Sequence, residues 1–179
     1  MSSKSLLFSI LTLIATSSIF AQNPIVKIDF DHINQPTAQV TEPEYTPWVV
    51  STSPSSFTTN GVTFKVTRQG LKGDALGTNW YKAGIQSPYY AKLVCDGLTV
   101  KGTTANEGGQ IELRISGLAT GTHTLLAFLN VTDSETFTYS PIDISVNGNL
   151  VLDNVIPSVK AVKTADAKSV YLNLQATAG

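Results

Sequence analysis

Short segments in which apolar and polar residues alternate, each bounded by turn residues, recur along this chain. The segment 26–30, for example, places Val26, Ile28 and Phe30 on one face. Successive side chains of a strand point to opposite faces of its sheet, so this period of two predicts strands with one buried face. Further alternating segments span 60–66, 91–100, 109–116, 142–155, 158–164 and 169–176. No segment keeps the 3.6-residue apolar period of a helix for long, so an all-β fold is predicted.

Turn dipeptides separate these predicted strands. Asn147-Gly148 lies between two alternating segments and is a strong signal for a two-residue hairpin. Asn60-Gly61 precedes another strand, and Asp96-Gly97 divides 91–100 into two predicted short strands. The segment 122–131 is apolar on both faces, which predicts a central strand. About eight to ten strands at this spacing in one domain predict a β-sandwich or jelly roll.

Residues 1–21 have the composition of a secretory signal peptide. One positive residue, Lys4, precedes an apolar run that reaches Phe20, and Ala21 is a small residue suited to cleavage. The run is too short and too rich in Ser and Thr for a bilayer span, and no cysteine follows it to carry a lipid. The protein is therefore predicted to be secreted, either extracellular or periplasmic. The mature domain would be 22–179, which is 158 residues (179 − 21).

Charge and cysteine content narrow the classes of partner. Without Lys4 the mature chain has 11 basic and 13 acidic residues, a net charge of −2 (11 − 13). Nucleic-acid binding usually needs a basic face, so no nucleic acid is expected, and no later segment is apolar enough to cross a membrane.

The single cysteine, Cys95, has no partner for an internal disulfide, and its apolar setting LVCDG predicts a buried, inert thiol.

Catalytic signatures are missing from the sequence. The mature chain has two histidines, His32 and His123, and none of the HExxH, GxSxG, P-loop or cysteine–histidine motifs. No active site within the chain itself is predicted. Asp29, Asp31 and His32 are possible metal ligands, but the two aspartates alternate with apolar residues. Their simplest expected place is the polar, solvent-facing side of the first strand.

Three segments together resemble a known group of domains. KIDF near the start, IELRISGLATGTHTLLAFLN and PIDISVNGNLVLDNV occur in the order seen in malectin-like and galactose-binding-like jelly rolls. Such domains begin with a strand like "v-d-F", followed by the patterns "GL..G.Y.l.l.f" and "fdV.vNG..v"; His123 stands where an aromatic residue is common. The resemblance covers residues 25–176, and its motifs specify the fold better than a ligand. These domains are similar to carbohydrate-binding modules of secreted bacterial polysaccharide-degrading enzymes, where they often precede a lyase or hydrolase domain.

The resemblance implies two further features. Such domains usually add one more strand after an "AG" turn, so we expect this jelly roll to lack its last strand and the chain to be the N-terminal part of a longer protein. They also often hold a structural calcium ion. Asp29 and Asp143, with nearby backbone carbonyls, are the expected ligands, because calcium prefers hard oxygen ligands. Solvent-facing strand carboxylates are the alternative interpretation of both residues.

The stretch 77–93, GTNWYKAGIQSPYYAKL, concentrates aromatic side chains. Trp80, Tyr81, Tyr89 and Tyr90 are four of the chain's 15 aromatic residues (2 Trp, 6 Tyr and 7 Phe). Aromatic rings suit the apolar faces of sugars, and irregular loops containing Gly and Pro often carry binding surfaces. The stretch is therefore predicted to contribute a ligand platform. Trp80, the largest ring, is expected to anchor the core, while Tyr81 and Tyr89 contact the ligand.

Other residues extend this predicted platform. Lys82 and Lys92 flank the aromatic rings and are suited to pair with uronate carboxylates. A second aromatic set, Tyr45 and Trp48, lies in the Pro-rich segment 42–50. The ligand is expected to be a polysaccharide or oligosaccharide.

The sequence as a whole predicts a non-catalytic glycan-binding module that targets an attached polysaccharide lyase or hydrolase to its substrate. Two alternatives stay open. One is a structural domain that packs against a catalytic neighbour without binding sugar. The other is a fragment of a polysaccharide lyase that contributes residues to a composite site. Exposed aromatic rings favour binding, whereas an apolar face that matches a downstream domain favours the structural role.

Overall fold

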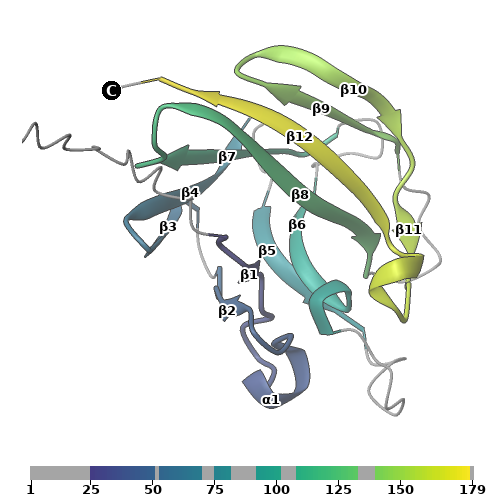
Figure 1. The fold of residues 1–179 in the computed structure, drawn as a ribbon. Coiled ribbons are helices and arrows are strands. Elements are labelled where there is room, and N and C mark those ends of the chain that lie inside the picture. The colour runs from purple at the N-terminus through teal and green to yellow at the C-terminus, as the bar shows by residue number, and fades with distance from the viewer. Residues whose placement is uncertain are drawn as a thin grey trace, which may run out of the picture.

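The protein is all-β, as the alternating segments predict. The structure is a computed structural model that describes residues 25–50, 53–69, 75–81, 92–101, 108–132 and 140–177. In this part of the chain, strands in several sheets form a sandwich, and the helical elements are one single-turn α-helix and two short 3₁₀ helices (Figure 1). Their bounds are α1 (Thr37–Val40), η1 (Lys92–Val94) and η2 (Thr164–Asp166). The predicted signal peptide lies outside the described residues.

One sheet of the sandwich has three antiparallel strands. β4 (Val62–Gln69) lies between β3 (Ser55–Thr59) and β7 (Gln110–Ser116). Asn60 and Gly61, with φ angles of 50° and 76°, form the two-residue turn between β3 and β4. Both positive φ values match the hairpin turns that Asn-Gly favours, so this turn signal is confirmed.

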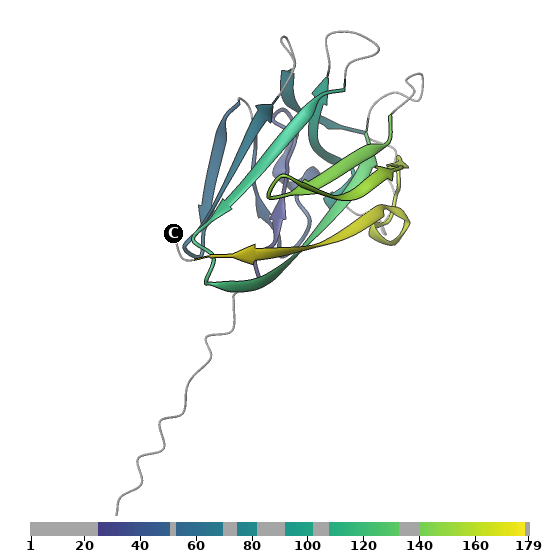
Figure 2. The same ribbon diagram turned by 90° about the horizontal axis from the view of Figure 1, so that it is seen from above.

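The second three-stranded sheet is built around β8 (Gly121–Val131). β12 (Lys168–Ala176) pairs with it antiparallel over its whole length, and the short β11 (Ser158–Val159) pairs parallel on the other side. The prediction of a central strand at 122–131 is confirmed. Seen from above in Figure 2, the β8–β12 pair lies across one side of the molecule and the β3–β4–β7 sheet stands on another.

The described residues also form three sheets of two strands each. β9 (Ile142–Val146) and β10 (Asn149–Val155) form the hairpin that Asn147-Gly148 predicts, with φ angles of 50° and 80° at the turn. The other two pairs are β5 (Ala75–Trp80) with β6 (Asp96–Lys101), antiparallel, and β1 (Ile28–Asp29) with β2 (Thr46–Pro47), parallel.

The prediction of two short strands joined at Asp96-Gly97 is wrong. The residues before this dipeptide form η1, because the Cys95 amide donates to the Lys92 carbonyl (3.1 Å) and closes a helical turn. Asp96 then begins β6, which takes β5 as its partner. Cys95 itself is fully buried, as its apolar setting predicts.

The main hydrophobic core lies beneath the β3–β4–β7 sheet. Trp48 is at its centre, with its ring 5.1 Å from that of Phe30 and 5.6 Å from that of Phe57. Its Nε1 donates to Ser55 Oγ (3.2 Å), and only 4% of the side chain is exposed. Trp48 is therefore a core residue, and the prediction that it contacts a ligand is wrong. The inward faces predicted for the first strand and for 60–66 are confirmed, since their apolar residues Val26, Ile28, Phe30, Val62, Phe64 and Val66 belong to this core.

A second core lies between the β8–β12 sheet and the β9–β10 hairpin. Val170 and Leu172 on β12 and Val155 on β10 are buried there. Only one face of the β8–β12 sheet takes part, because alternate side chains of β12 point the other way. Within the described ranges no helix has the length and apolar character needed to cross a bilayer.

Candidate functional site

Three aspartates are buried close together beside β1 and the start of β6. Asp29, Asp31 and Asp96 are 1%, 2% and 6% exposed. The expectation that Asp29 and Asp31 face solvent is wrong. The chain following β1 and the start of β6 cover this side of the strand, so the polar side chains of its alternation are sealed in rather than solvated.

Hydrogen bonds from the surrounding chain explain why this burial is tolerated. The Glu42 amide donates to Asp29 Oδ2 (2.7 Å), and the Thr41 hydroxyl donates to Asp31 Oδ2. The His32 amide donates to Asp96 Oδ2 (2.7 Å). Buried carboxylates need such donors, because an unpaired charge is costly away from water.

Burial also changes the protonation of the cluster. It raises the pKa of Asp29 to about 7 and that of Asp96 to about 8, and it raises the pKa of Asp31 as well. Mutual repulsion among the carboxylates acts in the same direction. The cluster therefore holds protons near neutral pH.

The two expected calcium ligands do not form one site. Asp143 lies on β9, where it is exposed and accepts a hydrogen bond from the Asn154 amide (2.9 Å), while Asp29 is buried on β1. In the part of the chain that the structure describes, no three His, Cys, Asp or Glu side chains are grouped so as to hold a metal ion. Asp31 Oδ1 is a buried oxygen without a hydrogen-bond partner there, which fits a hard cation beside the cluster. A calcium ion stays a prediction.

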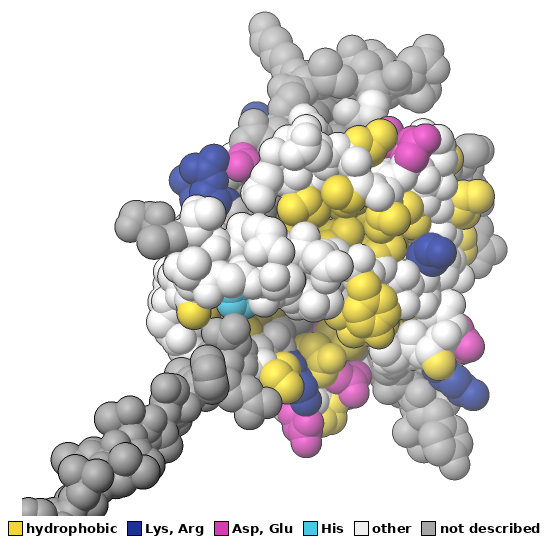
Figure 3. Space-filling model, turned by 45° about the horizontal axis from the view of Figure 1, so that its top comes forward, with side chains coloured by type: hydrophobic (Ala, Val, Ile, Leu, Met, Phe, Trp, Pro, Cys, Tyr) yellow, Lys and Arg dark blue, Asp and Glu magenta, His cyan; other side chains and the backbone are white. Residues whose placement is uncertain are grey.

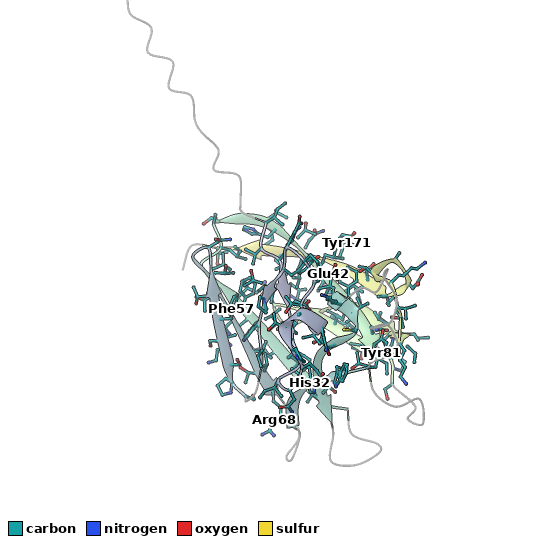
Figure 4. All side chains as sticks on the ribbon, turned by 90° about the horizontal axis from the view of Figure 1, so that it is seen from below. His32, Glu42, Phe57, Arg68, Tyr81 and Tyr171 are labelled. Atoms are coloured by element: carbon teal, nitrogen blue, oxygen red, sulfur yellow. The ribbon has the colours of Figure 1, made fainter. Side chains whose placement is uncertain are left out.

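Tyr81 belongs to a buried polar network. It is 7% exposed, and its hydroxyl donates to the carbonyl of Ala161. Asn130 on β8 donates to the Tyr81 hydroxyl (3.3 Å) and to the Val94 carbonyl (2.6 Å), and it accepts from the Ser158 hydroxyl (2.9 Å). The prediction that Tyr81 contacts a ligand is therefore wrong. The hydroxyl thus joins the end of β5 to the segment after β11; Tyr81 is labelled in Figure 4.

Tyr81→Phe is expected to lower the free energy of unfolding by about 1–3 kcal/mol, because it leaves a buried carbonyl without its donor. Urea unfolding of purified protein measures this change. Tyr45→Phe is the matched control, because the half-buried Tyr45 ring contacts the Lys27 ammonium (5.6 Å) and a phenyl ring keeps that contact. Equal losses in the two variants would contradict the assignment of the Tyr81 hydroxyl to the network.

Trp80 and His32 form an aromatic pair at one end of β5. Their ring centroids are 6.2 Å apart with an interplanar angle of 48°, and both side chains are half-buried. Trp80 is thus not the buried anchor that its size suggests, whereas its neighbour Tyr81 is. The Asn34 amide donates to His32 Nδ1 (3.1 Å), so a neutral His32 ring carries its proton on Nε2. Burial lowers the pKa of His32, which keeps the ring neutral at pH 7.

The other predicted platform residues are dispersed or outside the described ranges. Lys92 donates to the Ala38 carbonyl (2.7 Å), so its ammonium secures η1 to α1. Lys82, Tyr89 and Tyr90 lie outside the described residues. Trp80 is thus the one member of the predicted aromatic stretch that the described residues leave partly exposed.

The outward face of the β8–β12 sheet is not among the predicted binding surfaces. Tyr171 projects from β12 there, with 69% of its side chain exposed, opposite Leu126 on β8. The alternation at 169–176 already indicated this face, because it puts Tyr171 on the other side of the strand from its buried neighbours Val170 and Leu172. Its meaning depends on knowing that the described chain covers this face only at Phe128, which packs against Val94, Ala161 and Ala167, and leaves Tyr171 exposed.

Comparisons with protein-family models, with curated proteins and with solved structures found no match for this chain. The class of protein is defined by the structure alone, as an all-β sandwich. The resemblance to malectin-like and galactose-binding-like modules stays a prediction.

Proposed function

We propose that this chain is a non-catalytic glycan-binding module of a secreted polysaccharide-degrading enzyme. The observation that carries the proposal is the partly exposed Trp80–His32 pair. An indole ring can stack on the apolar C–H face of a sugar, and the neutral His32 offers an Nε2 donor for a hydroxyl group beside it.

Binding fits this chain better than catalysis. The buried aspartates are the described groups with the most perturbed pKa values, which is a common property of catalytic residues. However, each is at most 6% exposed, and each accepts a hydrogen bond from the surrounding chain. The glycosidic bond of a polysaccharide cannot reach carboxylates that are buried in this way.

Trp80→Ala and His32→Ala are expected to weaken glycan binding by a few-fold to about tenfold, since a stacking contact contributes roughly 0.5–1.5 kcal/mol. A polysaccharide pull-down with pectic, algal and host glycans measures binding, and a thermal melt of the same variants reports folding. Ile156→Ala is the control, because Ile156 is exposed and lies in the segment between β10 and β11. Wild-type binding by both folded variants would exclude this site.

An alternative role has its own support. Apolar side chains of the β9–β10 hairpin and the segment after it are exposed, including Leu150, Val151 and Ile156. Figure 3, with the top of Figure 1 turned forward, shows hydrophobic side chains gathered in one patch. Such a patch suits packing against a neighbouring domain. If the role is structural, Leu150→Gln should destabilise the complete enzyme and leave this domain's own melting temperature unchanged.

A further inference from the structure

We infer that the outward face of the β8–β12 sheet is a second glycan-binding surface, selective for uncharged polysaccharide chains. The inference rests on the proposed glycan-binding function and adds a site and a substrate class to it. We call this surface the Tyr171 face. It consists of the outward side chains of two paired strands, namely Thr122, Thr124 and Leu126 on β8 and Ser169, Tyr171, Asn173 and Gln175 on β12; it ends at Phe128, which packs against Val94, Ala161 and Ala167.

The register of the two strands sets the layout of this face. Tyr171 lies opposite Leu126, Asn173 opposite Thr124, and Gln175 opposite Thr122. Alternate residues of a strand are about 6.7 Å apart, so the ring and the two amides form a row along β12. A row of this kind suits an extended ligand better than a compact one.

Cross-strand hydrogen bonds hold the polar side chains in place. Gln175 Nε2 donates to the Thr122 hydroxyl (2.7 Å), and the Thr124 hydroxyl donates to Asn173 Oδ1 (3.3 Å). Each amide thus uses one of its two polar atoms within the sheet. Asn173 can still offer its Nδ2 donor, and Gln175 its Oε1 acceptor, to hydroxyl groups of a ligand. Fixing these groups in advance lowers the entropy lost on binding.

Tyr171 supplies the apolar part of the surface. At 69% exposure, Tyr171 is the most exposed aromatic residue among the described side chains. Leu126 beside it is 41% exposed. The two side chains therefore offer an apolar surface that a pyranose ring can contact. A phenol can also stack and hydrogen-bond at the same time.

The charge of the Tyr171 face selects the class of ligand. None of its seven side chains is acidic or basic: they are Thr, Leu, Ser, Tyr, Asn and Gln residues. A uronate or sulfate group placed here would lose water without gaining a cation, which is unfavourable. A neutral sugar chain needs only hydroxyl partners and an apolar surface. Protein partners are disfavoured as well, because the centre of a protein interface is usually more apolar than a surface with two exposed apolar side chains.

The Tyr171 face is separate from the Trp80–His32 pair. Figure 4 shows Tyr171 and His32 well apart on the molecule. The buried side chains between the outward positions of β12, Val170 and Leu172, pack on the β9–β10 hairpin instead. Substitutions at the two sites can therefore be examined independently.

Tyr171→Ala tests the inference, with a neutral galactomannan and a neutral β-glucan as probes and polygalacturonate as the acidic probe. We expect affinity for at least one neutral probe to fall about three- to tenfold, with an unchanged melting temperature. Tyr171→Phe keeps the stacking ring and should bind within about twofold of wild type. Asn173→Ala should weaken the same probe. Binding to the neutral probe should not change between about 50 and 500 mM NaCl, because no charged contact is involved.

Several results would overturn the inference. If Tyr171→Ala binds every probe like wild type while Trp80→Ala loses binding, the Tyr171 face fails and the proposed function stands. If wild type binds none of the probes, both fail. Selective binding of polygalacturonate would overturn the assignment to neutral chains. Concentration-dependent dimerisation that Tyr171→Ala abolishes, without any change in glycan binding, would show that the face contacts a second copy instead.

Discussion

Trp48→Ala is expected to lower the free energy of unfolding by about 3–5 kcal/mol, the usual cost of removing a large buried aromatic ring. The indole lies between Phe30 and Phe57 in the main core, and its Nε1 bonds to Ser55 Oγ. Its removal leaves a cavity where β2, β3 and the first strand meet, and it also leaves the Ser55 hydroxyl without its donor. The loss is a large part of the stability of an ordinary domain, which is roughly 5–15 kcal/mol.

Chemical denaturation of Trp48→Ala and Tyr45→Ala measures this difference. Tyr45 lies three residues earlier in the same predicted aromatic set, but its half-buried ring contacts Lys27 near the surface. Its substitution should therefore cost about 1 kcal/mol or less. A Trp48→Ala variant that melts like wild type and loses glycan binding would restore Trp48 as a ligand contact.

Thermal stability is expected to fall as the pH rises from about 5 to 8.5. Asp29 and Asp96 have pKa values of about 7 and about 8 in the folded protein, raised mainly by burial, whereas their ordinary value is 3.8. Between these values the folded protein holds protons that the unfolded chain has released. The contribution of these two groups to the free energy of unfolding is therefore complete below about pH 4, and it is lost as the pH rises through the folded-state pKa values of about 7 and about 8. The two groups interact, so we expect a combined loss of several kcal/mol, or roughly 10 °C or more in melting temperature.

Asp96→Asn separates this effect from other titrations. The amide carbonyl can still accept the His32 amide, but the side chain no longer ionises. The variant should show a shallower loss of melting temperature above pH 6 than wild type, with EDTA present in both series. Parallel pH profiles for the two proteins would contradict the assignment. Calcium that raises the wild-type melting temperature at pH 8, where the carboxylates ionise, would support the predicted cation beside Asp31.

The sequence by itself determined the local structure of this protein. The Asn-Gly turns, the strand that is apolar on both faces and the alternation at 169–176 all depend on residues adjacent in the chain, and each appears in the structure where it is predicted. Strand alternation and hairpin turns follow from backbone sterics and side-chain direction, which a short segment already contains.

Only the tertiary structure decided which of these side chains meet solvent. Trp48 and Tyr81 look like surface aromatics in irregular segments, yet the packing of distant strands buries both. Asp29 looks like the polar side of an exposed strand until the chain after it and β6 cover it. Tyr171 looks like an ordinary strand residue, but the hairpin β9–β10 covers only the opposite face of its sheet. Burial depends on partners far away in sequence, and for this reason the alternation of a strand predicts two faces but not which of them another element will cover.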